Sequence, residues 1–209
     1  MTKDKHYFFL FSAFTFCLFI FFSFLIHKNL FTGLDFNTTV RIQDHFSRRF
    51  DTWFSLFSLL GSVEIVSIIL LVIIALRRKM KSIIVLFSYA AIHLFELFGK
   101  IFVTHPGPPH LLFRYDIAFS FPSFYVQPGS SYPSGHSSRT AFISILLLLM
   151  IFRSKKLSSF QKATIFSLVL LFDITMFVSR IYLGEHWLSD VIGGVLLGVT
   201  FGFLSFIFI

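Results

Sequence analysis

Long apolar runs alternate with short polar segments along almost the whole chain. A run of roughly 20 apolar residues is long enough to cross the hydrocarbon core of a membrane as a helix. The pattern predicts six such helices, at residues 7–26, 53–76, 82–103, 136–152, 163–184 and 187–209. We therefore expect an all-α fold, a bundle of six transmembrane helices, in which residues 1–209 form a single membrane-embedded domain.

The composition favours the same fold class. Hydrophobic residues make up 56% of the 209 positions and charged residues only 13%, whereas a soluble domain usually carries about 25% charged residues. This excludes the binding functions of soluble domains. A net charge of +8 would suggest nucleic-acid binding in a soluble protein, but many of the cations here cluster between apolar runs. We therefore expect a membrane, and no nucleic acid, as a partner.

Two loops carry most of the clustered positive charge. They hold Arg77, Arg78, Lys79 and Lys81 between the second and third helices, and Arg153, Lys155, Lys156 and Lys162 between the fourth and fifth. Loops rich in Lys and Arg stay in the cytoplasm, so both termini are predicted to be cytoplasmic, in a plasma (inner) membrane. The loop at 104–135 and the turn between the last two helices are then extracytoplasmic. The segment at 27–52 mixes both charge signs and is interpreted as amphipathic and interfacial.

Ionisable residues at the ends of membrane helices are costly and usually functional. On the predicted outer side they are Lys100, His136, Arg139, Arg180, Glu185, His186 and Asp190. Lys100 and Arg180 are fixed donors for an anion, and a guanidinium suits phosphate well. The turn Pro133-Ser134-Gly135 directly precedes a helix, so it would present backbone N–H groups and partial positive charge to the same anion.

The histidines supply groups for chemistry on that anion. His186 and Asp190 are four residues apart at the start of a helix and therefore share a face. The carboxylate can hold one imidazole nitrogen as a donor and leave the other free as a nucleophile. His136 offers a second imidazole that could protonate a leaving alkoxide. Together these groups suggest phosphoryl transfer through a phosphohistidine.

The arrangement resembles the type-2 phosphatidic acid phosphatase superfamily, with its three motifs K-x6-R-P, P-S-G-H and S-R-x5-H-x3-D. The second motif is intact at 133–136 and the third is complete at 179–190, so the resemblance covers roughly residues 50–209. It implies that His186 is the nucleophile, His136 the general acid and Asp190 the group that orients His186. It also implies that phosphate oxygens are held by Lys100, Ser134, Gly135 and Arg180, and that neither a metal nor another cofactor is needed.

The first motif departs from the family pattern. The position that carries Arg in the family is Gly107 here, although Lys100 and Pro108 are present. We expect Arg139 or Arg114 to replace the missing guanidinium, because the first shares the helix face of His136 and the second lies in the same outer loop. His105 and His110 are weaker candidates for the same contact.

Several of these residues also have structural alternatives. Lys100 could extend to lipid head groups or pair with Glu96 one turn earlier, and the Pro-Ser-Gly turn could simply cap a helix. His186 and Asp190 could form a structural pair. The acidic residues inside the predicted spans, Glu64 and Asp173, are either protonated packing residues or, for Asp173, a partner of the site.

The sequence therefore predicts a metal-independent membrane enzyme. It would hydrolyse a lipid phosphomonoester or pyrophosphate at the outer membrane face and release inorganic phosphate. The family resemblance offers phosphatidic acid, phosphatidylglycerophosphate, undecaprenyl pyrophosphate and lipid A phosphates as substrates. Transfer to an acceptor other than water is an alternative, as is a catalytically silent lipid-phosphate binder or transporter, for which the argument is Gly107.

Overall fold

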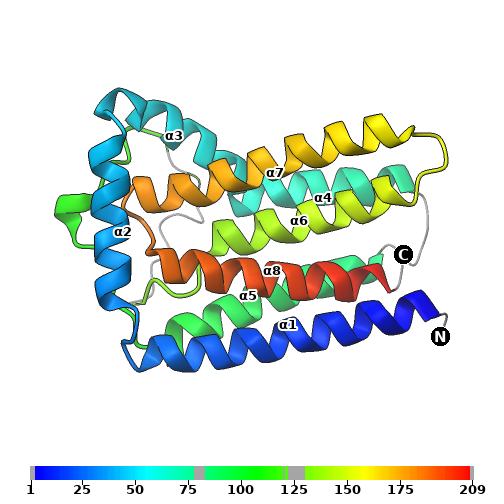
Figure 1. Ribbon diagram of the computed structural model, residues 1–209, viewed down its shortest axis with the longest axis horizontal. Coiled ribbons are helices and arrows are strands. Elements are labelled where there is room, and N and C mark those ends of the chain that lie inside the picture. The colour runs from blue at the N-terminus through cyan, green and yellow to red at the C-terminus, as the bar shows by residue number, and fades with distance from the viewer. Residues whose placement is uncertain (1–2, 78–82, 120, 122–129, 208–209) are drawn as a thin grey trace.

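The computed structural model describes residues 3–77, 83–119, 121 and 130–207, and its regular structure in these ranges is helical. The α-helices are α1 (Lys3–His27), α2 (Thr32–His45), α3 (Asp51–Ser58), α4 (Val63–Arg77), α5 (Ile84–Phe102), α6 (Gly135–Phe152), α7 (Ser159–Tyr182) and α8 (Leu188–Phe206). Helices α1 and α4 to α8 run along the long axis of a bundle, and α2 lies across one end (Figure 1). The predicted all-α membrane fold is confirmed.

Five helices, α1 and α5 to α8, are each long and apolar enough to cross a membrane. The remaining predicted span, at 53–76, is bent. Its parts, Arg48–Gly61 and Val63–Leu76, meet at 45°. Helix α4 starts afresh because Ser62 has extended backbone and its Oγ accepts a hydrogen bond from Ile65 N at 3.3 Å. The number of spans is six when the bent pair is taken as one crossing.

Helices α6 and α8 form the inner pair of the bundle. Three glycines of α8, Gly194, Gly198 and Gly202, are spaced four residues apart and face α6. A Cβ atom at Gly198 would collide with the carbonyl oxygen of Ser138 and the side chain of Ala141. Small residues at this spacing allow two membrane helices to bring their backbones together.

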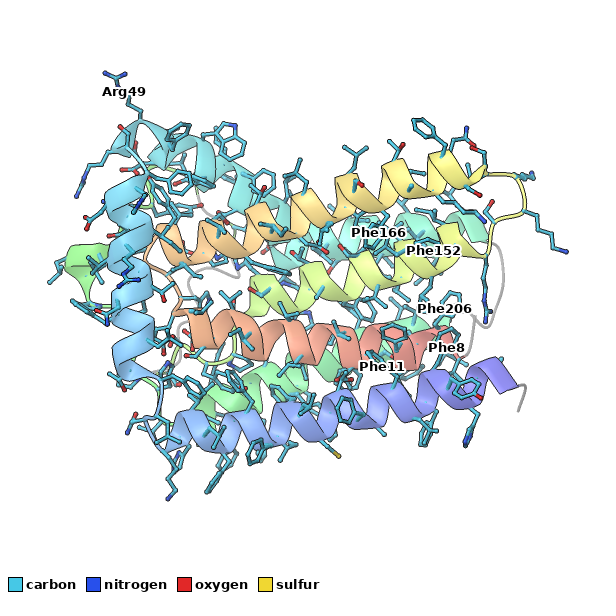
Figure 2. All side chains as sticks on the ribbon, viewed as in Figure 1. Phe8, Phe11, Arg49, Phe152, Phe166 and Phe206 are labelled. Carbon is cyan, nitrogen blue, oxygen red and sulfur yellow. The ribbon has the colours of Figure 1, made fainter. Side chains whose placement is uncertain are left out.

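Helix α1 packs on the outer side of α8. Near the middle of α1, Ser12 Oγ donates to the carbonyl of Thr200 at 2.9 Å, and Thr200 Oγ1 donates to Thr15 Oγ1 at 2.9 Å. At the end of the bundle that carries both chain termini, Phe8 packs against Phe206 with ring centroids 5.6 Å apart (Figure 2). Polar bonds therefore fix the register of α1, and aromatic contacts close its free end.

The predicted amphipathic segment contains α2, whose buried face is polar. Asp35, Thr39 and Gln43 are buried and four residues apart, so they line one face of the helix. Gln43 Nε2 donates to the carbonyls of Leu112 at 2.7 Å and Tyr182 at 2.8 Å. Helix α2 thus ties together the segment after α5 and the end of α7.

The basic loops bear on the orientation. Arg78, Lys79 and Lys81 lie outside the described residues. The loop between α6 and α7 lies at the end of the bundle where α1 begins and α8 ends, away from α2 (Figure 1). The predicted cytoplasmic elements that are described therefore share one end, and the side of the membrane that this end faces stays a prediction.

Candidate active site

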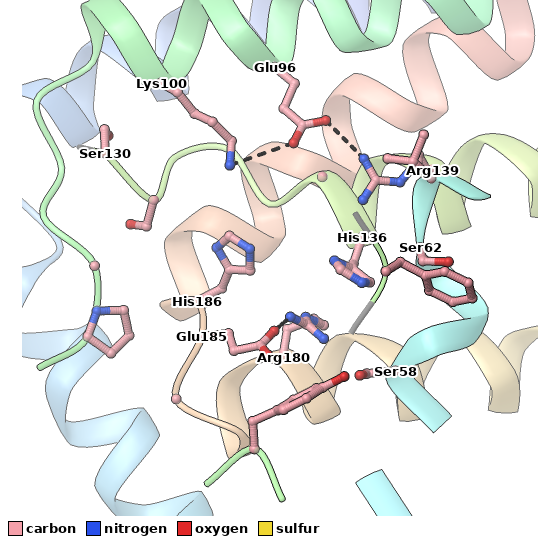
Figure 3. Close-up of a pocket in the computed structure, with 18 of the residues that line it drawn as sticks. Ser58, Ser62, Glu96, Lys100, Ser130, His136, Arg139, Arg180, Glu185 and His186 are labelled. Atoms are coloured by element: carbon pink, nitrogen blue, oxygen red, sulfur yellow. Dashed lines mark hydrogen bonds and ion pairs between the residues drawn. The ribbon is translucent and has the colours of Figure 1, made fainter. Parts of the chain in front are cut away.

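A cavity of about 820 Å³ opens near the α2 end of the bundle. The predicted site residues on its wall are Lys100, Gly135, His136, Arg139, Arg180 and His186. They come from the end of α5, the start of α6, the end of α7 and the turn before α8 (Figure 3). Residues 80 positions apart in sequence are thus brought to one space, as the shared outer face predicted.

The turn between α7 and α8 presents His186. The backbone N–H groups of Glu185 and His186 both donate to the carbonyl of Arg180 at 3.2 Å. The chain then reverses at Gly184, whose φ of 68° is unfavourable for residues with a Cβ. A side chain there would also collide with the backbone of Leu112. The turn is therefore fixed by its own backbone.

Asp190 lies directly behind His186. Its Oδ2 accepts the backbone N–H of Trp187 at 2.9 Å and is 3.4 Å from His186 Nδ1. Because α8 begins only at Leu188, the pair meets through the capping turn of the helix rather than across a helical face. The contact at Nδ1 leaves Nε2 as the ring nitrogen available for chemistry.

The surroundings of His186 favour its neutral form. Burial, together with the positive charges of Arg180 and Lys100, holds the pKa of His186 well below its ordinary value. Its side chain is only 11% exposed. A neutral imidazole has a free lone pair, so His186 is in the state that a nucleophile requires.

The start of α6 positions His136. Ser134 is the N-cap of this helix, and its Oγ accepts hydrogen bonds from Ser137 N at 3.4 Å and Ser137 Oγ at 3.0 Å. Its own N–H donates to the Asp190 carbonyl at 3.0 Å, which joins the two histidine motifs. Ser134 is fully buried and is not on the cavity wall, unlike Gly135 and His136. The capping alternative is therefore observed for the Ser134 side chain.

The cations of the cavity are paired with carboxylates. Glu96 lies 3.7 Å from Lys100 Nζ and 3.1 Å from Arg139 Nη1 (Figure 3). Arg180 forms an ion pair with Glu185. An arriving phosphate would find these donors already turned toward acceptor oxygens and would compete with the carboxylates for them.

The two candidates for the missing first-motif arginine occupy different places. Arg139 is on the wall, and its Nε also donates to the Gly61 carbonyl at 3.1 Å, at the bend between α3 and α4. Arg114 is not on the wall. It donates to the Phe46 carbonyl at 3.3 Å and lies over the ring of Tyr182, 5.1 Å from its centroid. The placement favours Arg139.

Other residues complete the description of the cavity. His110 is on the wall, whereas His105 is 5% exposed and lies behind it. Asp173 accepts a hydrogen bond from Ser144 Oγ at 2.6 Å and joins α7 to α6 away from the cavity wall. Within the described residues no group of three or more His, Cys, Asp or Glu side chains could hold a metal ion.

Two features of this region were not predicted from the sequence. One is the second partner of Glu96: this carboxylate was considered only as a partner of Lys100, but it also forms an ion pair with Arg139. The other is the contact of Asp35 with Ser189, described below. The sequence does place polar residues four apart at Asp35, Thr39 and Gln43. An isolated amphipathic helix would expose such a polar face to water, so the spacing alone did not indicate that these residues are buried.

Two curated proteins that are similar to this chain are named as phosphatases. Phosphatidylglycerophosphatase B of Bacillus subtilis is 31% identical over 74 residues, which are 35% of this chain and 36% of that protein. The dihydrosphingosine 1-phosphate phosphatase C823.11 of Schizosaccharomyces pombe is 40% identical over 72 residues, 33% of this chain and 17% of that protein. The chain thus matches well under two thirds of the length of either relative.

Two crystal structures share the fold. The PAP2 type phosphatidylglycerolphosphate phosphatase of B. subtilis superimposes with a TM-score of 0.74 over 93% of each chain, at 19% identity. LpxE of Aquifex aeolicus superimposes with a TM-score of 0.61 over 83% of this chain and 94% of its own, at 25% identity. The PAP2 superfamily model matches residues 81–209, more than half of the sequence, which confirms the resemblance seen in the motifs. The chain belongs to the PAP2 superfamily.

Proposed function

We propose that this protein is a membrane lipid phosphatase that works through a phosphohistidine on His186. The observation that carries the proposal is the buried His186–Asp190 pair, which shares a cavity with His136 and the cations Lys100 and Arg180. A nucleophile, its orienting carboxylate, a second imidazole and anion donors are the groups that this reaction needs.

Substrate binding would begin with an exchange of partners. The phosphate oxygens take the donors of Lys100 and Arg180 that now face Glu96 and Glu185. The partial positive charge at the start of α6, where Gly135 lines the cavity, adds to this site. These fixed positive groups supply the charge stabilisation that a metal ion would otherwise provide, so the reaction is proposed to be metal-independent.

The chemistry then follows in two steps. His186 Nε2 attacks phosphorus, the bond from phosphorus to the lipid oxygen breaks, and His136 gives a proton to the leaving alkoxide. Asp190 accepts a hydrogen bond from Nδ1–H and so stabilises the positively charged imidazole ring. In the second step water attacks the phosphohistidine and gives a proton to His136, and the phosphorus–nitrogen bond breaks to release inorganic phosphate.

The lipid is proposed to reach the cavity sideways. The wall near the bend between α3 and α4 carries apolar residues, Leu59 and Val63, and α5 adds Leu97 beside Glu96. Acyl chains could follow this apolar side while the head group meets the cations. With the α6–α7 basic loop at the opposite end of the bundle, the cavity is proposed to be extracytoplasmic in a plasma membrane, with both termini cytoplasmic.

The names of the relatives guide the choice of substrate. Phosphatidylglycerophosphate and dihydrosphingosine 1-phosphate, the substrates that those names state, are both lipid phosphomonoesters. We therefore expect a phosphomonoester to be preferred over a pyrophosphate here.

The test is phosphate release from a panel of lipid phosphates by detergent-purified protein in EDTA. His186→Ala should lower the rate at least about 10³-fold, because it removes the nucleophile. His45→Ala is the matched control, since this histidine of α2 is exposed and its Nδ1 contacts the carbonyl of Arg41 in the same helix. Equal rates for His186→Ala and wild type would contradict the mechanism. Transfer of phosphate to an added lipid would indicate a phosphotransferase, and binding without release a silent binder.

A further inference from the structure

A second buried polar cluster lies behind Asp190, built from residues that are not among the specified positions of the three motifs. Ser189 donates twice to Asp35 of α2, from its backbone N to Oδ1 at 2.9 Å and from its Oγ to Oδ2 at 2.7 Å. His105, from the segment after α5, places Nε2 at 3.2 Å from Ser189 Oγ and 3.7 Å from Asp35 Oδ2. Three elements far apart in sequence thus meet at one imidazole.

The same imidazole reaches the group that orients the nucleophile. His105 Nε2 lies 3.5 Å from Asp190 Oδ1. The other carboxylate oxygen, Oδ2, faces His186 Nδ1 at 3.4 Å. The two oxygens of Asp190 are therefore divided between His105 on one side and His186 on the other. A path of polar contacts runs from Asp35 through His105 and Asp190 to His186.

Burying these charged and polar groups costs desolvation free energy, which suggests that the cluster has a function beyond packing. Asp35 is 1% exposed, His105 5% and Asp190 0%. Burial raises the pKa of Asp35 above its ordinary value, although its hydrogen bonds from Ser189 oppose the effect. Well-packed apolar side chains of similar volume would often stabilise such a site equally well. Packing alone therefore does not account for two carboxylates around one imidazole.

We infer that Asp35 and His105 are positioning residues for the reaction at His186. His105 Nε2–H donates to Ser189 Oγ, which in turn donates to Asp35, so these two residues hold the ring of His105. The ring then lies 3.5 Å from Asp190 Oδ1, and this polar contact favours the orientation of the Asp190 carboxylate that faces His186. Neither residue touches the cavity where the phosphate would lie. The inference rests on the proposed role of His186, and it gives α2 a task beyond covering the end of the bundle.

The geometry predicts an effect on the rate of reaction and little effect on binding. Asp35→Asn removes the charge at nearly constant volume, and His105→Phe removes the ring nitrogens. Each should lower kcat about 10- to 100-fold, the range found when a partner that orients a metal-binding histidine in a metalloenzyme is removed. KM for the lipid and the inhibition constant for inorganic phosphate should each stay within about threefold, because the phosphate donors are untouched.

A matched control separates positioning from packing. Thr39 lies one turn after Asp35 on the same buried face of α2, and its hydroxyl has no hydrogen-bond partner among the described residues. Thr39→Val should leave kcat and KM as in wild type. The double variant Asp35→Asn/His105→Phe should have a kcat close to that of the single variant with the lower kcat. The effects of residues that act as one unit do not add.

Three results would overturn the inference. They are a wild-type kcat for Asp35→Asn and His105→Phe, an equal loss of kcat in Thr39→Val, or a loss confined to KM. If Asp35→Asn does not fold, Ser189→Ala decides, because it removes one bridging oxygen; it should lower kcat about fivefold, and a wild-type value would refute the inference. Wild-type protein and His186→Ala are measured in the same assay. If wild type is active and His186→Ala is inactive, the proposed function holds even when the positioning role of Asp35 and His105 is refuted.

Discussion

The inner helix pair, α6 and α8, differs from the outer helices α1 and α7 in a way that apolar run length does not reveal. All four are long apolar helices. In their most apolar stretches 56% of α6 and 61% of α8 is buried inside the protein, compared with 22% of α1 and of α7. The outer helices expose large side chains such as Phe160 and Leu171. The inner pair instead has glycine at its contact.

This difference explains how the two histidine motifs meet. His136 belongs to the start of α6 and Asp190 to the start of α8, and the Ser134 N–H to Asp190 carbonyl bond of 3.0 Å requires the two backbones to be close. Gly194, one turn after Asp190, permits this approach because a Cβ there would collide with the Ser134 carbonyl. Close helix packing in the inner pair is thus a condition for the geometry of the site.

Filling the contact of the inner pair should have the largest effect. Gly198→Leu forces its side chain into the Ser138 carbonyl and Ala141, so we expect a loss of about 3 kcal/mol or more in the free energy of unfolding, with loss of phosphatase activity. Leu171→Ala on the exposed face of α7 should change it by less than about 0.5 kcal/mol. Thermal unfolding in detergent measures both. Similar losses for the two variants would show that inner and outer helices do not differ as described.

Much of the fold was readable from hydropathy because apolar runs must become helices in a membrane. The predicted start of the fourth span, His136, is one residue from the observed start of α6 at Gly135. The bend at 61–62 was not predicted, because the apolar pattern continues through it. The local Ser62 cap is accompanied by a contact across the bundle, in which the Gly61 carbonyl accepts a hydrogen bond from Arg139 Nε.

The site was predictable where chemistry follows a motif and unpredictable where it depends on contacts across the bundle. The spacing of His186 and Asp190 indicated their pairing, and membrane topology brought His136 to the same face. The contacts of Asp35 and His105 depend on how α2 crosses the end of the bundle. No spacing within the sequence encodes that crossing.

The second-largest predicted effect is on kcat/KM and concerns the guanidinium that replaces the first-motif arginine. Arg139→Ala, on the inner helix α6, removes a cavity donor and leaves Glu96 without a partner at 3.1 Å. We expect kcat/KM to fall about 30-fold, which corresponds to about 2 kcal/mol for a charged hydrogen bond. Arg114→Ala, beside the end of outer helix α7, should stay within about threefold because it does not line the cavity. The reverse order of effects, or wild-type values for both, would refute the assignment.

A smaller effect tests how Lys100 acts on the charge state of His186. Lys100 belongs to α5, which is 28% buried in its most apolar stretch and so resembles the outer helices. Lys100→Gln should lower the maximal kcat/KM about tenfold and move the acid limb of its pH profile to higher pH. The cation of Lys100 lowers the pKa of His186, so its removal raises this pKa and leaves more imidazole protonated at acid pH. Arg180 keeps acting in the same direction, and Glu96 in the opposite one. Lys28→Gln is the control, because Lys28 is exposed at the end of α1. An acid limb that stays in place would show that Lys100 does not act on His186.

The smallest effect tests how an outer helix is joined to the site. The hydroxyls of Tyr132, just before α6, and Ser23 of α1 lie 2.8 Å apart. Tyr132→Phe keeps the ring, which stacks on Phe19, and Ser23 keeps its bond to the Phe19 carbonyl. The expected loss in the free energy of unfolding is therefore only about 0.5 to 1 kcal/mol. Tyr7→Phe, at an exposed position near the start of α1, should cost nothing measurable.

The pH dependence of that loss sharpens the test. Burial raises the pKa of Tyr132 above its ordinary value, so the phenol keeps its proton throughout the neutral and mildly alkaline range. The melting temperatures of wild type and Tyr132→Phe should then differ by the same amount at pH 6 and pH 9. A difference that disappears at pH 9 would mean that the hydroxyl ionises and is exposed to water. In that case α1 would be held to α8 by its apolar side chains, by the Ser12 and Thr15 contacts with Thr200 and by the bond from Lys5 to the Ile207 carbonyl. The outer helix would then be less closely coupled to the site than the structure indicates.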